Sequence, residues 1–432
     1  MNLQIRGVKT KSGNISIQVI SRPNRKLKVE KHIGTGKTLD EILLLKKQAQ
    51  EYIQKQLKLL SLPLIMDPEH KKLLDNIKIK GIYHNFIYEF LCDCYKKMGF
   101  DQNKEKLIRD LAIIRIVEPS SKLRAIQLLE KYFRVSYSED QLYKKINKFH
   151  KEKETFEQIA IAFARENLDF DFSIVFYDVT TLYFESFKED EFKKCGFSKD
   201  NKFNQPQILI ALIVDKTGFP IAYEIFEGNK FEGHTFIPSI IRFQEKNNIE
   251  KLTILADAAM LSRANIDELK QRNLNYVVGA RIGNLPMTAI EDISSKLNAE
   301  DGKIIFIETD EGKLICDYSK KRANKDKADR KKQILRAERS ITQSSKAIKK
   351  LKFVKIDGIS AEIDKKLVKK SELLEGIKGY YTNLLDVPLK TIIERYKDLW
   401  KIEKAFRIAK NDLEARPIYH WKKNSIESHI LI

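Results

Sequence analysis

Long hydrophobic stretches are missing from this sequence of 432 residues. The longest uninterrupted apolar run, residues 208–214, has seven residues, whereas a helix needs about 20 to cross a bilayer. The first residues also lack the apolar core of an export signal. The sequence therefore excludes a membrane-spanning protein and predicts a cytoplasmic one.

Cysteine, glycine and proline are scarce as well. The four cysteines, Cys92, Cys94, Cys195 and Cys316, have the spacing of neither a disulfide framework nor a zinc site. With 17 Gly, 10 Pro and 42% apolar residues, the composition fits neither a fibrous repeat nor wholesale disorder. We expect a folded protein with reduced thiols, and the length predicts about two to four domains.

Acidic residues are outnumbered, with 60 Asp and Glu against 80 Lys and Arg, for a net charge of +20. Residues 1–60 hold 13 basic and 4 acidic residues, and residues 320–350 hold 13 basic and 3 acidic ones. Clustered positive charge of this kind attracts polyanions such as nucleic acids. A polyanionic partner is the leading interpretation, and a surface that is basic throughout is the alternative.

The N-terminal part is expected to contain a β-hairpin followed by a helix. Apolar and polar residues alternate on both sides of a turn within residues 15–30, and residues 39–60 have helical apolar spacing. Gly34 and Gly36 between them suggest a phosphate loop, but Lys31 stands where that motif needs glycine. No nucleotide cofactor is therefore expected.

The rest of the chain predicts a helical region followed by an α/β region. Apolar spacings of three and four make residues 82–168 all-helical, and the composition changes at Asp171. Beyond it we expect strands at 172–184, 207–215, 219–226, 252–257 and 276–280, with helices at 234–245 and 263–272. Three antiparallel strands followed by alternating helix and strand is the order of a ribonuclease-H-like core. A long helix over 389–413 is expected to pack back on this sheet.

The predicted fold class is therefore α/β, a ribonuclease-H-like mixed sheet core with a β-rich insertion domain, preceded by a β-hairpin segment and an all-helical domain. The expected boundaries are an N-terminal segment at 1–65, a helical DNA-binding domain at 66–168, a catalytic core at 169–285 and 386–432, and an insertion domain with a basic helix at 286–385.

Three carboxylates are the strongest candidates for chemistry. Asp178 and Asp257 lie in or at the ends of apolar strands, where an unneutralised carboxylate is costly. Glu403 recurs with Tyr396 and Lys410 at intervals of seven residues, so on one continuous helix the three share a stripe. Brought together, the carboxylates suit two Mg²⁺ ions that act on a phosphodiester. The alternative is a salt-bridge network, such as Glu403 with Arg407.

These residues resemble the DDE transposases of bacterial insertion sequences. The branch in question has the signature Tyr, two residues, Arg, three residues, Glu, six residues, Lys, which Tyr396, Glu403 and Lys410 match, while Leu399 replaces the Arg. The similar blocks are 177–184, 218–221, 226–229, 256–260 and 416–421. The resemblance covers essentially the whole chain and is strongest from Asp178 onwards.

The resemblance implies a function and a set of roles. Asp178, Asp257 and Glu403 would be the catalytic residues and the ligands of two Mg²⁺ ions, with Mn²⁺ as a substitute. Tyr396 and Lys410 would contact DNA near the scissile phosphate. The protein would be a transposase that binds element ends as a homodimer on double-stranded DNA, cleaves them and transfers the strand to target DNA, in association with the nucleoid.

Further basic residues are candidates for DNA contacts. Arg407 or Arg395 would replace the missing Arg of the signature. The segment 320–350 would supply DNA affinity that does not depend on the DNA sequence. Its candidate contact residues are Lys331, Lys332 and Arg336.

Two rival functions stay open at this point. One is a ribonuclease-H-like nuclease without strand transfer. The other is a truncated, inactive DNA-binding remnant, because the chain stops in an apolar run where relatives continue. On that view Ile426, Ile430 and Ile432 are expected to be exposed apolar surface.

Overall fold

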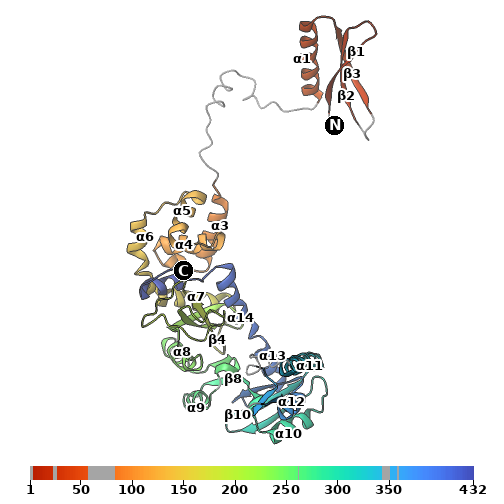
Figure 1. The fold of residues 1–432 in the computed structure, drawn as a ribbon. Helices are drawn as coiled ribbons and strands as arrows, with labels where there is room; N and C mark the ends of the chain where they lie inside the picture. Colours follow the sequence, from red (N-terminus) through yellow and green to blue (C-terminus); the bar gives the residue numbers. More distant parts are fainter. Residues whose placement is uncertain (1–2, 23–26, 57–82, 261, 343–350, 358–359) are drawn as a thin grey trace. The chain divides into compact units, whose positions relative to one another are not determined.

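The structure is a computed structural model. It describes residues 3–22, 27–56, 83–260, 262–342, 351–357 and 360–432. The chain divides into two units, residues 1–82 and residues 83–432, and each is described by itself. Figure 1 shows the elements of both.

The first unit is a three-stranded antiparallel sheet with one helix. Its elements are β1 (Gln4–Lys9), β2 (Ile15–Ser21), β3 (Lys28–Gly36) and α1 (Leu39–Gln56), with the strands in the order β1-β2-β3. The predicted hairpin is confirmed as β2 and β3, whereas β1 was not predicted. Gly34 and Gly36 are part of β3, so they form no phosphate loop. Residues 57–60 of the predicted helix lie outside the described residues.

The second unit begins with the predicted helical region. Its elements are α3 (Asn85–Lys97), η3 (Phe100–Gln102), α4 (Lys106–Val117), α5 (Lys122–Phe133), α6 (Glu139–Ile146), η4 (Phe149–Glu152) and α7 (Lys153–Asn167). Apolar side chains of α4, α5 and α6 form one buried cluster. Ser121 caps α5 by accepting a hydrogen bond from the Arg124 backbone N–H.

A mixed sheet of eight strands follows. Its first five strands are β4 (Ile174–Tyr183), β5 (Gln207–Val214), β6 (Pro220–Glu227), β7 (Thr253–Ala256) and β8 (Asn275–Ala280). They lie in the order β6-β5-β4-β7-β8. The β4–β5 and β5–β6 pairs are antiparallel, and the β4–β7 and β7–β8 pairs are parallel. The five predicted strands and their order along the chain are thus found.

Residues 286–385 extend this sheet. Strands β9 (Ile304–Thr309), β10 (Gly312–Tyr318) and β13 (Ile377–Thr382) continue it beyond β8 in the order β13-β10-β9. The other elements of the segment are α10 (Met287–Leu297), α11 (Lys320–Thr342), the β11–β12 hairpin (Val354–Asp357 and Ser360–Ile363) and α12 (Lys365–Leu373). That strands so far along the chain pair with β8 could not be predicted, because local alternation does not encode pairing partners.

Helices cover both faces of the sheet. Buried side chains of α8 (Gly233–Lys246), α9 (Arg263–Gln271) and α10 pack on one face. On the other face pack α13 (Leu389–Lys397) and α14 (Trp400–Arg407). Among the described helices, none is long and apolar enough to cross a membrane.

The predicted continuous helix over 389–413 is wrong. It is broken at Asp398 and Leu399 between α13 and α14, and it ends in a π-helical turn, η8 (Ile408–Asp412). Tyr396, Glu403 and Lys410 therefore lie on three different segments, and the seven-residue stripe does not hold.

The expected exposure of the last apolar residues is also wrong. Helix α15 (Lys423–Leu431) packs against the helical region, where Ser428 Oγ accepts a hydrogen bond from the His150 N–H at 2.9 Å. Ile426 is buried, and Ile430 and Ile432 are half-buried against apolar clusters. Figure 1 shows this end of the chain beside α4 to α6.

Candidate active site

Asp178 and Asp257 occupy neighbouring positions on two parallel strands. Tyr177 of β4 is paired with Ala256 of β7, and each aspartate is the next residue along its strand direction. Side chains alternate between the two faces of a sheet. Because Tyr177 points toward the α8 and α9 face, Asp178 points toward the opposite face, which α13 and α14 cover. Asp257 directly follows the last residue of β7 and lies close enough to Tyr396 of α13 to affect its pKa.

Burial and neighbouring acids perturb Asp178. Its pKa is raised to about 6, chiefly by burial, with Glu232 and Asp257 adding to the rise. Lys199 and a 2.7 Å hydrogen bond from the Val179 N–H oppose it. Lys199 Nζ lies 3.1 Å from Glu232 Oε1 and 4.0 Å from Asp178 Oδ1. The site is therefore a concentration of negative charge that one lysine partly compensates.

Tyr396 lies near all three candidate carboxylates, Asp178, Asp257 and Glu403. The side chain is only 4% exposed and packs edge-on against Tyr380. Burial raises the pKa of its hydroxyl, and Asp257, Asp178 and Glu403 raise it further. All three predicted acids thus lie close enough to Tyr396 to raise the pKa of its hydroxyl. Tyr396 is a buried residue beside these acids, and its predicted contact with DNA near the scissile phosphate stays a prediction.

Glu403 lies in the first turn of α14 and is exposed. No ion pair joins it to Arg407 or to any other residue in the described parts of the chain, so this example of the salt-bridge alternative is not found, whereas Asp178 does lie 4.0 Å from Lys199. Arg407 and Arg395 are also exposed. Leu399, which replaces the signature Arg, is buried in the apolar cluster under α14.

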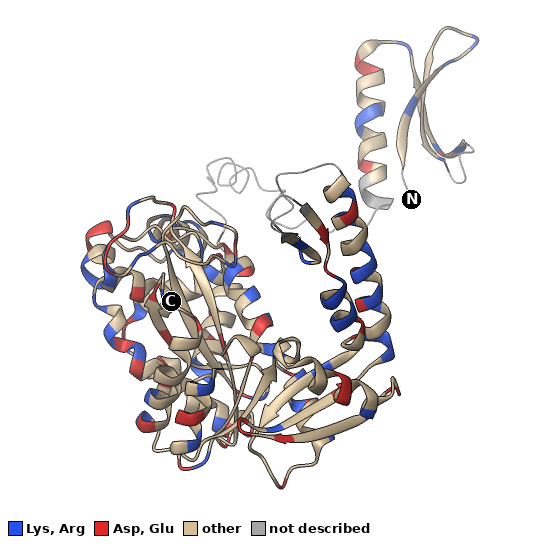
Figure 2. Ribbon diagram, turned by 60° about the horizontal axis from the view of Figure 1, so that its bottom comes forward, with Lys and Arg blue, Asp and Glu red and all other residues tan. Residues whose placement is uncertain are grey.

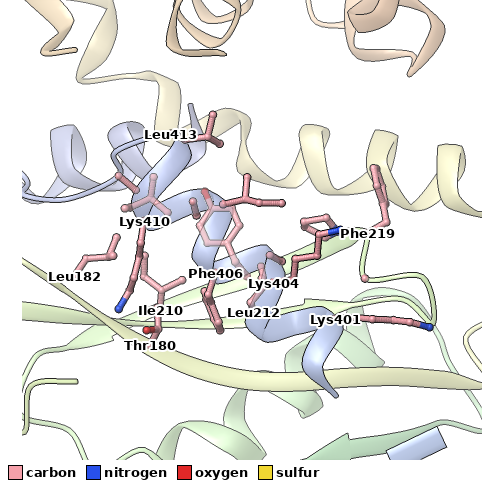
Figure 3. A pocket seen from close by; sticks show the side chains of 18 of the residues that line it. Thr180, Leu182, Ile210, Leu212, Phe219, Lys401, Lys404, Phe406, Lys410 and Leu413 are labelled. Carbon is pink, nitrogen blue, oxygen red and sulfur yellow. The ribbon is translucent and has the colours of Figure 1, made fainter. Parts of the chain in front are cut away.

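Lys410 has an acidic partner that the sequence did not indicate. Its Nζ donates to Asp200 Oδ2 at 3.3 Å, and Arg416 pairs with the same carboxylate. Burial lowers the Lys410 pKa, and Asp200 opposes that effect. Figure 3 shows the side chain pointing from η8 toward the sheet. In this structure Lys410 holds the loop between β4 and β5.

We expect Lys410→Ala to lower the free energy of unfolding by about 1.5–3 kcal/mol, because it removes a charged hydrogen bond that is largely shielded from water. Asp200→Asn is expected to have a similar effect, and the double variant less than the sum of the two. Urea denaturation measures all three. A loss below about 0.5 kcal/mol for Lys410→Ala would show that the pair contributes nothing to stability.

At position 279 the site has room for glycine only, because a larger side chain would clash with Tyr396. A Cβ there would overlap Tyr396 Oη and lie 3.1 Å from Ala258 N. Gly279→Ala is therefore expected to displace the phenol and to cost about 1–3 kcal/mol of stability. Gly283→Ala is the matched control, since its nearest contact would be at 4.0 Å. Equal urea midpoints for the two variants would contradict the close packing of Tyr396 against Gly279.

The predicted phosphate-binding residues of α11 lie on its surface. Lys331, Lys332 and Arg336 are exposed, whereas Arg330 is buried and pairs with Glu372 and Glu375. Figure 2 shows that Lys and Arg are spread over many elements, with acidic residues among them. Helix α11 can thus present cations to a polyanion without losing its own packing.

The acids have the donor chemistry for a hard divalent cation, namely carboxylate oxygens. The raised Asp178 pKa, to which Asp257 and Glu232 contribute, indicates negative charge that a cation would compensate. Within the described ranges, no three His, Cys, Asp or Glu side chains lie close enough together to form a ligand group. Glu403, which lies on the short helix α14, is the carboxylate that would have to move closer to Asp178 and Asp257 to complete a three-carboxylate site.

A large cavity lies beside this site but does not contain it. Its volume is about 730 Å³, and Figure 3 shows apolar side chains from the strands, such as Leu182 and Ile210, facing Phe406 and Leu413. None of Asp178, Asp257 and Glu403 lines it. The candidate chemistry therefore lies over the interior strands β4 and β7 and not in this apolar cavity.

Three residues of the site were missed from the sequence. Lys199 and Asp200 lie in the polar connector between β4 and β5, where nothing in the pattern marks them. Glu232 directly precedes α8, and a carboxylate at a helix start was the one available signal.

Comparisons with known proteins were made for the whole chain. A family model described as "Transposase DDE domain" matches residues 169–432. Among solved structures, the piggyBac transposase synaptic complex with hairpin DNA has 10% sequence identity and a TM-score of 0.38, and the match covers 72% of this chain and 56% of that one. The Mos1 transposase paired-end complex with left transposon end has 14% identity and a TM-score of 0.18, with 48% and 65% covered. The chain thus spans less than two thirds of either one. A search of curated proteins gave no significant match.

Proposed function

The chain belongs to the family of transposase DDE domain proteins, and from this premise we propose that it binds the ends of its own element, cleaves the DNA there and joins the freed 3′-hydroxyl to target DNA. The observation that supports the proposal is the placement of Asp178 on β4 beside the end of the parallel strand β7, which Asp257 directly follows, with both aspartates and Glu403 near the buried Tyr396.

The proposed core is ribonuclease-H-like. The strand order β6-β5-β4-β7-β8, with antiparallel pairs followed by parallel ones, supports it. We keep the division into an N-terminal segment (1–65), a helical DNA-binding domain (66–168), a core (169–285 and 386–432) and an insertion (286–385) as part of the proposal. The insertion then contributes strands to the core sheet.

Asp178, Asp257 and Glu403 are the residues that would hold two Mg²⁺ or Mn²⁺ ions. When bound, such ions activate the attacking oxygen and stabilise the leaving oxygen of a phosphodiester. Carboxylates bind metal in their ionised form. Lys199 favours that form at Asp178 by compensating its charge in the metal-free chain.

The other residues of the proposal bind and position DNA. Exposed Lys331, Lys332 and Arg336 would contact phosphates along α11. Arg407 and Arg395, exposed on α14 and α13, are the candidates for the contact that Leu399 cannot make. Tyr396 and Lys410 would contact DNA near the scissile phosphate, and Lys410 would leave Asp200 to do so. A homodimer on double-stranded DNA, associated with the nucleoid, completes the proposal.

A strand-transfer assay tests the function. Oligonucleotides taken from the inverted repeats that flank the gene are incubated with the protein, target DNA and Mg²⁺. Joined product supports a transposase. Cleavage without joining would replace it by a ribonuclease-H-like nuclease, and binding without cleavage by an inactive remnant.

A further inference from the structure

A second cavity lies between the helical region and the segment that leads into α15. Its volume is about 750 Å³. The start of α5 contributes Lys122, α6 contributes Tyr143, and the segment after η8 contributes Arg416, His420 and Lys422. None of the carboxylates of the candidate active site lines it, so it is a separate place on the molecule.

Basic side chains gather beside this cavity, which Lys122, His420 and His429 line and Arg115 does not. Lys122 is 6% exposed, and no hydrogen bond or ion pair joins its Nζ to any described residue. Arg115 is buried beside it and donates to the carbonyl oxygens of Leu413 and Glu414 at 2.7 and 3.0 Å. The rings of His420 and His429 lie 5.3 Å apart. Four basic groups thus share one poorly hydrated region.

Acids do little to neutralise this cluster. Burial lowers the Lys122 pKa, and the nearby Arg115 lowers it further. Burial also lowers the pKa of His420, to about 4, with smaller contributions from Lys122 and Arg115. Glu414 is the acid that lines the cavity; it raises the Arg115 pKa, and its own side chain is exposed. A buried lysine without a partner is costly, and an anion in the cavity would remove that cost.

We propose that this cavity binds a phosphate group of the DNA backbone, with Lys122 as the cation at its inner wall. A phosphate accepts hydrogen bonds from several cations at once. Arg416 and Lys422 line the same cavity. Tyr419 and Trp421, each 63% exposed, also line it and offer surfaces on which bases stack. The assignment of the phosphate to DNA rests on the proposed function, whereas the anion site itself does not.

Thermal unfolding of the full chain tests the anion site. Midpoints are compared in inorganic phosphate and in chloride at equal ionic strength. We expect phosphate to raise the midpoint of the wild type and of Lys144→Met, an exposed lysine of α6 outside the cavity. Lys122→Met is expected to raise the midpoint in chloride, because an unpaired charge is removed, and to abolish the phosphate-dependent rise.

If Lys122→Met does not fold, Lys422→Met replaces it, since Lys422 lines the cavity but is exposed. That variant is expected to shrink the phosphate-dependent rise. A wild type whose midpoint does not respond to phosphate, or a response that neither variant changes, overturns the anion site.

DNA binding tests the source of the phosphate. Lys122→Met should lower the slope of log K against log salt by about 0.9, the value of one phosphate contact, and Lys144→Met should leave it unchanged. A phosphate response in unfolding together with an unchanged slope would rule out DNA as the source. Absence of DNA binding by the wild type would contradict the proposed function and leave the unfolding result to decide the anion site.

Discussion

Asp178→Asn, Asp257→Asn and Glu403→Gln are each expected to lower the rate of DNA cleavage by about a thousandfold or more, which is about 4 kcal/mol in the barrier. Each change removes one anionic oxygen ligand and keeps the size of the side chain. Binding of element ends is expected to persist, because phosphate contacts come from other residues. Cleavage of labelled oligonucleotides gives the rate, and gel shifts give the affinity.

Glu394→Gln is the matched control for Glu403→Gln. It lies on α13, is exposed and is in no ion pair with a described residue. We expect normal cleavage from it. Any one of the three acids whose amide variant cleaves as fast as this control loses its place in the site.

The triple variant Lys331→Ala, Lys332→Ala, Arg336→Ala is expected to make DNA binding much less sensitive to salt. Three lost phosphate contacts at about 0.9 each lower the slope of log K against log salt by about 2.7. A fourfold rise in salt should then weaken the wild type about 40-fold more than the variant. Fluorescence anisotropy with labelled duplex DNA at several salt concentrations measures both slopes.

A second triple variant removes the same charge elsewhere. Lys188, Lys251 and Lys366 are exposed and form no ion pair within the described parts of the chain. Their replacement by Ala should leave the slope within about 0.5 of the wild-type value, since distant exposed charges are screened. Equal slope changes in the two triple variants would mean that net charge, and not α11, controls binding.

The strands that carry the two aspartates could be predicted because their signal is local. Residues 172–184 and 252–257 are short, largely apolar runs bounded by polar turns, with Asp178 in the middle of the first and Asp257 at the end of the second. That the two aspartates are neighbours depends on the β4–β7 register, which no local pattern contains. The expectation that the two aspartates lie close together rests only on the predicted strand order, which is that of a ribonuclease-H-like core.

The break between α13 and α14 could not be seen from periodicity. Leu399, Ile402 and Phe406 keep facing the same apolar cluster on both sides of it, so the pattern of apolar positions reads as one helix. What breaks the helix is a change of backbone hydrogen bonding, in which the N–H groups of Asp398 and Leu399 bond to the carbonyls three residues back, and apolar spacing carries no sign of that change. Ion pairs such as Lys410 with Asp200 join residues 210 positions apart and leave no trace in spacing.

Binding of Mn²⁺ to the metal-free chain tests the central claim most directly, because it needs no knowledge of the DNA sequence. Isothermal titration calorimetry on the wild type is expected to show Mn²⁺ binding that Asp178→Asn and Asp257→Asn abolish and that Glu394→Gln leaves intact. Wild-type Mn²⁺ binding that both aspartate variants retain in full would contradict the assignment of these carboxylates as the metal site of a transposase.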